Sequence, residues 1–189
     1  STYTFTMPDR DVELTAHFLP DGEVAENMFT LTLAANAEIG GSVSPTPVTL
    51  LSGHQIVIDA EANPSYQFVN WLDDQGTYIA GTLSHTYTMP SRNVTLTASF
   101  VHDDDAANLR TLTLLSNPTE AGTVGPEAQM QLLENQQVVV EAIPTGEYAF
   151  VNWTDHTSSV VASTLTHTYT MPAGNVTLTA HVSQDWEWT

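Results

Sequence analysis

An internal repeat with a spacing of 82 residues constrains the fold of this chain more than any other feature of its sequence. Residues 83–98 read LSHTYTMPSRNVTLTA and residues 165–180 read LTHTYTMPAGNVTLTA, and the two segments agree at 13 of 16 positions. The same spacing relates Phe-Val-Asn-Trp at 68–71 to the identical letters at 150–153. Because repetition at a fixed spacing is typical of tandem structural modules, the same fold is predicted to occur more than once in the chain.

The repeat divides the chain into modules, linkers and one truncated copy. The spacing falls to 81 residues on the N-terminal side, so one residue is inserted between Gly122 and Val138. A third copy is present only as its end, at residues 4–16. Each full module has about 75 residues, which is near the lower size limit for a single hydrophobic core. The predicted boundaries are 1–19 for the truncated repeat, 20–27 for a linker, 28–102 for the first module, 103–108 for an acidic linker, 109–183 for the second module and 184–189 for a tail.

Apolar residues alternate with threonine along much of each module, and this period of two predicts strands rather than helices. In the first module the alternation is strict over 29–33, 85–89 and 94–100. Residues 55–60 and 67–72 read as two further strands, and the second is apolar on both sides, which predicts a central position in a sheet. The predicted fold class is therefore all-β to β-rich α+β, with small tandem modules arranged as an elongated array.

The charge of the chain excludes several classes of partner. It has 22 acidic residues against 3 arginines and no lysine, which gives a net charge of −19. Binding to nucleic-acid phosphates requires clustered basic side chains, and an anionic membrane surface would repel such a chain. The absence of cysteine removes disulfides and thiolate metal sites. No apolar run approaches the roughly 18 residues of a spanning helix, so membrane insertion is not expected.

Four motifs in each full module resemble those of the divergent internalin-type B-repeat family of bacterial surface proteins. They are an opening TLTL strand, a glycine-rich turn such as IGGSV at 39–43, a Tyr-x-Phe-x-x-Trp block at 66–71 and 148–153, and a closing YTMPxxNVTLTA segment. The familiar form has glycine after the tryptophan, whereas Leu72 and Thr154 stand there in this chain. The turn after that strand is therefore expected to differ.

The resemblance implies small, β-grasp-like modules in extracellular or cell-wall-attached proteins, where they act as spacers or adhesive stalks. It implies no catalytic residue, and the chain is not predicted to be an enzyme or to need a cofactor.

Two sets of residues are candidates for metal ligands or acid–base groups. His85 and His167 are equivalent in the repeat and are predicted to lie on the outer register of their strand, where neither has a second histidine or carboxylate at ligand spacing. Asp103, Asp104 and Asp105 offer oxygen atoms for calcium between the modules. Because the DxDxDG spacing of a calcium loop is absent, a solvated acidic linker is the alternative interpretation.

The four tryptophans decide whether the chain offers an aromatic binding platform. Trp71 and Trp153 lie within otherwise apolar strands, which predicts packing in the core rather than sugar stacking. Trp186 and Trp188 are flanked by acidic residues near the end of the chain, and their pattern leaves open whether they begin another element or pack on the second module.

Two hypotheses of function follow from these patterns. In the first, the chain is a non-catalytic, monomeric spacer or stalk of an adhesin-like bacterial cell-surface or secreted protein, and its partners are other domains of that protein. In the second, the modules recognise a glycan or a host protein through exposed aromatic side chains. The repetition favours the first hypothesis, because the repeated residues are those that preserve a fold.

Overall fold

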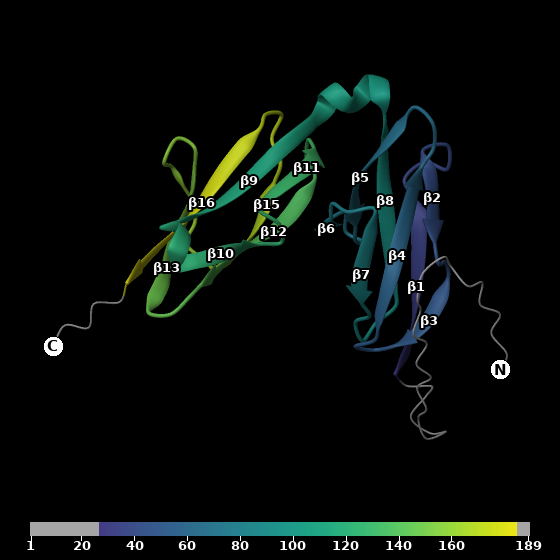
Figure 1. The fold of residues 1–189 in the computed structure, drawn as a ribbon, viewed down its shortest axis with the longest axis horizontal. Helices are drawn as coiled ribbons and strands as arrows, with labels where there is room; N and C mark the ends of the chain where they lie inside the picture. Colours follow the sequence, from purple (N-terminus) through teal and green to yellow (C-terminus); the bar gives the residue numbers. More distant parts are fainter. Residues whose placement is uncertain (1–26, 185–189) are drawn as a thin grey trace.

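A computed structural model describes residues 27–184, which form two modules of eight strands each (Figure 1). The predicted truncated repeat at 1–19 and the tryptophans of the tail lie outside the described residues. The first module comprises β1 (Met28–Ala35), β2 (Gly41–Ser44), β3 (Val48–Leu51), β4 (Gln55–Ala62), β5 (Tyr66–Leu72), β6 (Tyr78–Ala80), β7 (Ser84–Thr88) and β8 (Val94–His102). The second comprises β9 (Leu109–Asn117), β10 (Gly122–Gly125), β11 (Gln129–Leu133), β12 (Gln137–Pro144), β13 (Tyr148–Asp155), β14 (Val160–Ala162), β15 (Thr166–Thr170) and β16 (Val176–Gln184).

Each module contains two sheets. A five-stranded sheet has the order β3-β1-β8-β5-β6 in the first module and β11-β9-β16-β13-β14 in the second, and a three-stranded sheet has the order β2-β4-β7 or β10-β12-β15. The first and last strands of each module are neighbours and run parallel, whereas the other pairs are antiparallel. The expectation of β-rich tandem modules is confirmed, and β5 has the interior position that its apolar sequence predicts.

The core of each module lies between its two sheets. Trp71 and Trp153 are fully buried there, which confirms the prediction that they pack in the core. Their indole Nε1 atoms donate hydrogen bonds to main-chain oxygens, of Thr82 at 3.2 Å and of Leu165 at 3.3 Å. A buried indole is thus satisfied without a polar side chain opposite it. The threonines that alternate with core residues lie mostly on the outer faces of the strands.

The last two strands of each module are consecutive but do not form a hairpin. Strand β7 pairs with β4, whereas β8 pairs with β1 and β5, so the turn after Pro90 carries the chain from one sheet to the other. This crossing lets Met89, which directly follows β7, and Leu96 of β8 enter the same core. The side chain of Asn93 closes the turn, because its Oδ1 accepts a hydrogen bond from the backbone N–H of Thr30 at 2.8 Å.

The turn after the tryptophan strand is built on an aspartate in both modules. Asp73 Oδ1 accepts hydrogen bonds from the backbone N–H groups of Gln75 and Thr77, at 2.9 and 2.8 Å. Asp155 does the same in the second module, and its bonds to Thr157 and Ser159 lower the pKa of its carboxyl group. Left-handed backbone, which glycine favours, occurs three residues further on, at Gly76 and its equivalent Ser158.

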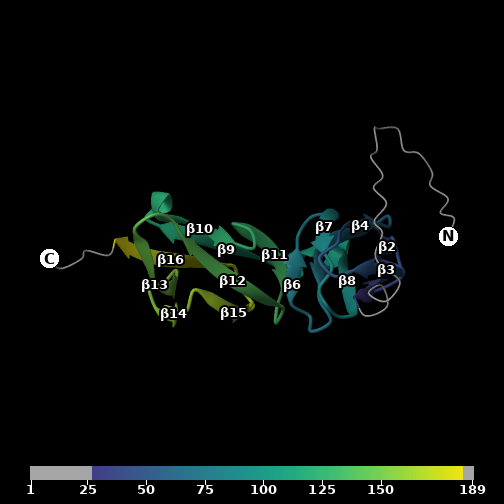
Figure 2. The same ribbon diagram turned by 90° about the horizontal axis from the view of Figure 1, so that it is seen from below.

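The modules are joined by a short 3-10 helix, η1 (Asp103–Asn108). Arg110 fixes the end of this linker to the second module, because its guanidinium donates to the carbonyl oxygens of Ala107 and Ala173. The two modules lie one after the other along the long axis of the molecule, with η1 at one edge (Figure 1). Figures 1 and 2 both place β6 of the first module beside β11 and β12 of the second.

Candidate functional site

The contact between the modules, here called the joint, is centred on Tyr78. This side chain comes from β6 of the first module, is only 4% exposed, and belongs to the core cluster of the second module together with Met130 and Val138. Val69 on the neighbouring strand β5 is also 4% exposed. A β-bridge between Thr77 and Gln137 links the backbones beside the tyrosine. The first module thus inserts an aromatic side chain into the core of the second.

Polar contacts surround this apolar centre. The Asn70 amide Nδ2 donates to the main-chain oxygen of Gln131 and to Oε1 of Gln136, both at 3.0 Å. The backbone N–H of Gly81 donates to Glu127 Oε1 at 3.1 Å. Asn70 is fully buried, although its equivalent in the second module, Asn152, is partly exposed. Because hydrogen bonds are directional, the two bonds from Asn70 fix how the second module is placed against the first.

Two side chains in or near the joint have shifted pKa values, and Glu127 contributes to both. Burial, reinforced by the nearby Glu127 carboxylate, raises the pKa of the Tyr78 phenol well above its usual range, so the hydroxyl stays protonated. Burial lowers the pKa of His85, and the attraction of Glu127 opposes that shift without cancelling it. The buried Tyr78 hydroxyl lies next to the Glu127 carboxylate but makes no hydrogen bond of ordinary geometry within the described residues. The Glu127 carboxylate is therefore the charge that acts on both of these side chains.

Glu127 lies in the segment that contains the inserted residue of the second repeat. Two residues separate Pro45 from Val48 in the first module, whereas three separate the equivalent Pro126 from the equivalent Met130 in the second. In the first module Thr46 Oγ1 accepts a hydrogen bond from the N–H of Leu33 at 2.8 Å. In the second module the backbone oxygen of Ala128 accepts the equivalent bond, from the N–H of Leu114. The extra residue therefore leaves the fold intact and adds length where the modules meet.

A cavity of about 200 Å³ lies beside the joint, and both modules contribute to it. Its walls include Gln67 and Phe68 from β5 and Gln129 and Gln131 from β11. Its lining is mixed in polarity, with amide side chains next to the aromatic ring. The contact between the modules is thus anchored by a few buried groups with a cavity at its side.

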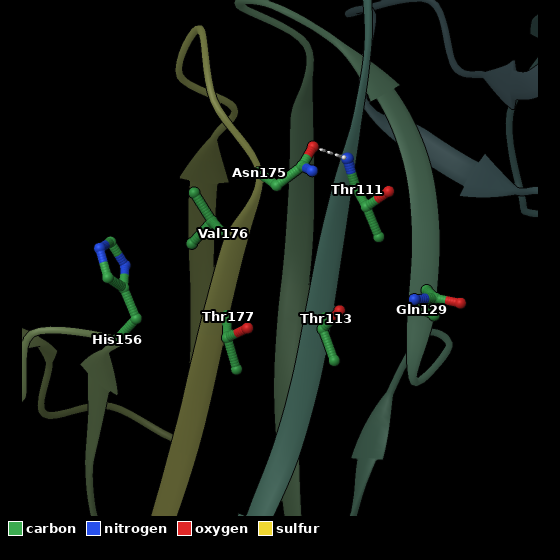
Figure 3. A pocket seen from close by; sticks show the side chains of 7 residues that line it. All are labelled: Thr111, Thr113, Gln129, His156, Asn175, Val176 and Thr177. Carbon is green, nitrogen blue, oxygen red and sulfur yellow. Dashed lines mark hydrogen bonds between the residues drawn. The ribbon is translucent and has the colours of Figure 1, made fainter.

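A shallow, open depression recurs on the outer face of the five-stranded sheet of each module, and Figure 3 shows the side chains that line it in the second module. In the second module it has a volume of about 350 Å³, and Asn175 in its wall accepts a hydrogen bond from the N–H of Thr111 at 2.9 Å. His156 lies on the opposite side from Gln129, and the equivalent of this histidine in the first module is Asp74. The walls therefore keep their threonines but change charge between modules. The full lining is Thr111, Thr113, Gln129, His156, Asn175, Val176 and Thr177.

The predicted calcium ligands lie on the linker helix. Asp103, Asp104 and Asp105 are exposed in the first turn of η1, where the N–H of Asp104 donates to Nδ1 of His102 at 3.2 Å. Within residues 27–184, no three His, Asp or Glu side chains are grouped to hold a metal ion. Calcium binding stays a prediction, which scattering with added Ca²⁺ and a triple Asp→Asn variant would test.

The predicted position of the paired histidines is wrong. His85 and His167 are half-buried on the same strand face as Tyr87 and Tyr169, while the threonines between them are exposed. The histidines therefore belong to the inner register, because side chains two apart on a strand point to the same face. The joint itself was not predicted, although Tyr78 and Glu127 both mark places where the two repeats differ.

These features define the chain as a protein of tandem β-modules with a docked joint. The family model for the divergent InlB B-repeat domain matches residues 31–104 and again 112–185, and the chain belongs to this family. Domains of this family occur in bacterial surface proteins. No curated protein and no solved structure matches the chain. Among the described residues, no helix has the length and apolar character needed to cross a membrane.

Proposed function

We propose that the chain is a non-catalytic spacer segment of a bacterial cell-surface or secreted adhesin-like protein, and that its joint holds successive modules in a fixed relative orientation. The observation that carries the proposal is the burial of Tyr78 in the core of the following module. An array joined only by a flexible linker would bend freely, because six residues of coil permit many orientations. A joint with buried apolar and hydrogen-bonded contacts restricts that freedom.

The distribution of repeated residues supports a structural rather than a catalytic role. Many of the residues that are identical in both modules build the core or close turns, as Trp71 and Asn93 do in the first. The polar depression, in contrast, carries Asp74 in one module and His156 in the other. A reaction centre repeated in tandem would be expected to keep its titratable groups, because catalysis depends on their pKa values.

Recognition of a glycan or a host protein through exposed aromatics is the competing function. Trp71 and Trp153 are fully buried and offer no face for stacking. The hypothesis therefore rests on Trp186 and Trp188, which lie outside the described residues. Substitution of both by alanine, followed by a glycan-array binding comparison, tests it directly.

The distance between spin labels on the two modules tests the spacer proposal. The chain has no cysteine, so Val57→Cys and Ile143→Cys provide two unique labelling sites on exposed positions of different modules. A rigid joint gives one narrow distance distribution in pulsed electron paramagnetic resonance. Tyr78→Ala should broaden it, whereas Val160→Ala, which removes the exposed counterpart of that tyrosine, should not. A broad distribution in the otherwise unaltered chain would refute the proposal.

A further inference from the structure

The second module exposes the same face that the first module buries in the joint. Val151 and Val160 are 47% and 60% exposed, whereas their equivalents Val69 and Tyr78 are each 4% exposed. Strand β13 carries the same two-sided Phe-Val-Asn-Trp pattern as β5. The second module buries this apolar face of the first module, whereas the equivalent face of the second module is exposed to solvent. An exposed apolar face of this kind is a candidate interaction surface.

The polar contacts of this face are also available. Asn152 corresponds to Asn70, whose amide donates across the joint to the backbone of Gln131. The Oδ1 atoms of Asn152 and Asn70 are both buried without a partner among the described residues, so the two amides have similar surroundings on that side. The face therefore combines two exposed valines with an amide that can reach a neighbouring strand edge, as in the joint.

The first module presents the complementary edge. Strand β3 is the equivalent of β11, the strand that receives the joint, and it is likewise the edge of its five-stranded sheet. Val48 on β3 is half-buried, whereas its equivalent on β11, Met130, is 2% exposed. Thr49 takes the place of Gln131, whose backbone oxygen accepts the asparagine amide. The described part of the chain thus carries both halves of a joint, one at each end.

We infer that the β13–β14 face of the second module docks onto the β3 edge of the first module in another copy of this chain. This contact repeats the arrangement of the joint, in which the equivalent strand β5 of the first module contacts β11 of the second. The two surfaces differ, so the contact is head-to-tail and extends into an open chain rather than closing a symmetric dimer. The inference does not depend on the proposed spacer function, since it concerns association between chains and not the stiffness within one.

Two differences weaken this contact relative to the joint. Val160 replaces the anchoring tyrosine, and the shorter segment before β3, with Thr46 and Pro47, has no carboxylate in the place of Glu127. Ser163 takes the place of Gly81, where a Cβ would lie 2.7 Å from the tyrosine hydroxyl, so Val160→Tyr is combined with Ser163→Gly below. The net charge of −19 on each copy adds repulsion, which salt screens. Association should therefore be weak, should increase with protein concentration, and should strengthen as sodium chloride is added. A contact held by opposite charges would respond to salt in the other direction.

Sedimentation velocity of the whole chain, from micromolar to millimolar concentration, measures this association. Val160→Asp should weaken self-association by about tenfold or more, because it places a charge in an apolar contact. The double variant Val160→Tyr with Ser163→Gly should strengthen it. Val57→Asp is the matched control, since Val57 is 47% exposed but lies on the three-stranded sheet of the first module. Equal effects of the two aspartate variants would overturn the inference.

A mixing experiment separates a head-to-tail contact from a symmetric one. Thr49→Glu alters the β3 edge and should also abolish growth of the chain of copies, while Val160→Asp alters the opposite end. A mixture of the two variants retains one intact pair of surfaces and should form one-to-one dimers that do not grow. If Thr49→Glu leaves association unchanged, the contact is symmetric and the inference is wrong. It also fails if the unaltered chain and the tyrosine–glycine variant both remain monomeric at millimolar concentration in high salt.

Discussion

Replacement of Tyr78 by alanine should uncouple the unfolding of the two modules. The side chain belongs to β6 of the first module but packs in the core of the second. Its loss therefore removes an interaction that exists only when both modules are folded and docked. We expect the second module to unfold at a lower denaturant concentration than in the unaltered chain, and the transitions of the two modules to become independent of each other.

The expected loss of unfolding free energy follows from the surface area that the tyrosine side chain buries. An aromatic side chain that is 4% exposed removes about 200 Å² from water, which corresponds to about 5 kcal/mol. Burial of a hydroxyl without a partner offsets this by about 1–3 kcal/mol. The expected loss on Tyr78→Ala is therefore about 2–4 kcal/mol. Tyr78→Phe removes only the unpartnered hydroxyl and should leave stability unchanged or slightly increased.

Hydrogen exchange during denaturant titration resolves the two modules, because peptides from each report their own protection. Val160→Ala is the control at the equivalent position of the second module, where the 60% exposed side chain should contribute within about 0.5 kcal/mol. If Tyr78→Ala unfolds in one transition with the original midpoint, the tyrosine does not couple the modules. Loss of stability confined to the first module would equally contradict its assignment to the core of the second.

Trp71→Ala and Trp153→Ala should each destabilise their own module by about 3–5 kcal/mol, as expected for a fully buried aromatic, and domain-resolved unfolding should show the other module much less affected. Gly81→Ala should weaken the joint, because the new Cβ would lie 2.7 Å from the tyrosine hydroxyl, whereas Gly125→Ala meets nothing within 4 Å and should be neutral by the spin-label measurement. Burial lowers the pKa of His85 in the folded state, so the unfolded chain binds its proton more readily. The first module should therefore lose stability as pH falls below about 6.5, and His85→Gln should flatten the stability–pH curve.

The sequence predicts the modules well because their cores depend on local patterns. Alternation of apolar residues and threonine identifies strands whichever sheet they join, and the burial of Trp71 follows from its apolar neighbours. The apolar pattern does not predict which sheet a strand joins. Strands β7 and β8 are consecutive in the sequence, yet they pair with strands of different sheets. The outer register predicted for His85 is wrong because it was assigned from the polar character of histidine and its threonine neighbours. The side chain lies on the same strand face as Tyr87, two residues away.

The joint could not be predicted from repetition, because its specific residues are not repeated. Tyr78 aligns with a valine, and Glu127 lies in the segment with the inserted residue. The apolar pattern on both sides of β5 predicted burial of both its faces, and the structure covers Val69 with the second module, while the equivalent Val151 is exposed. Differences between otherwise identical repeats are therefore the signal that could have found the joint.

The parallel pairing of the first and last strands determines how each module responds to tension. In the first module, β1 and β8 are joined in register from Leu31 opposite Val94 to Ala35 opposite Ala98, and the second module repeats this pairing between β9 and β16. A force applied between the start of β1 and the end of β8 acts along the strands in opposite directions. The hydrogen bonds between them are then loaded in shear and must break together, rather than one after another as in peeling. A pulled array of such modules would yield in discrete steps, each at a high force.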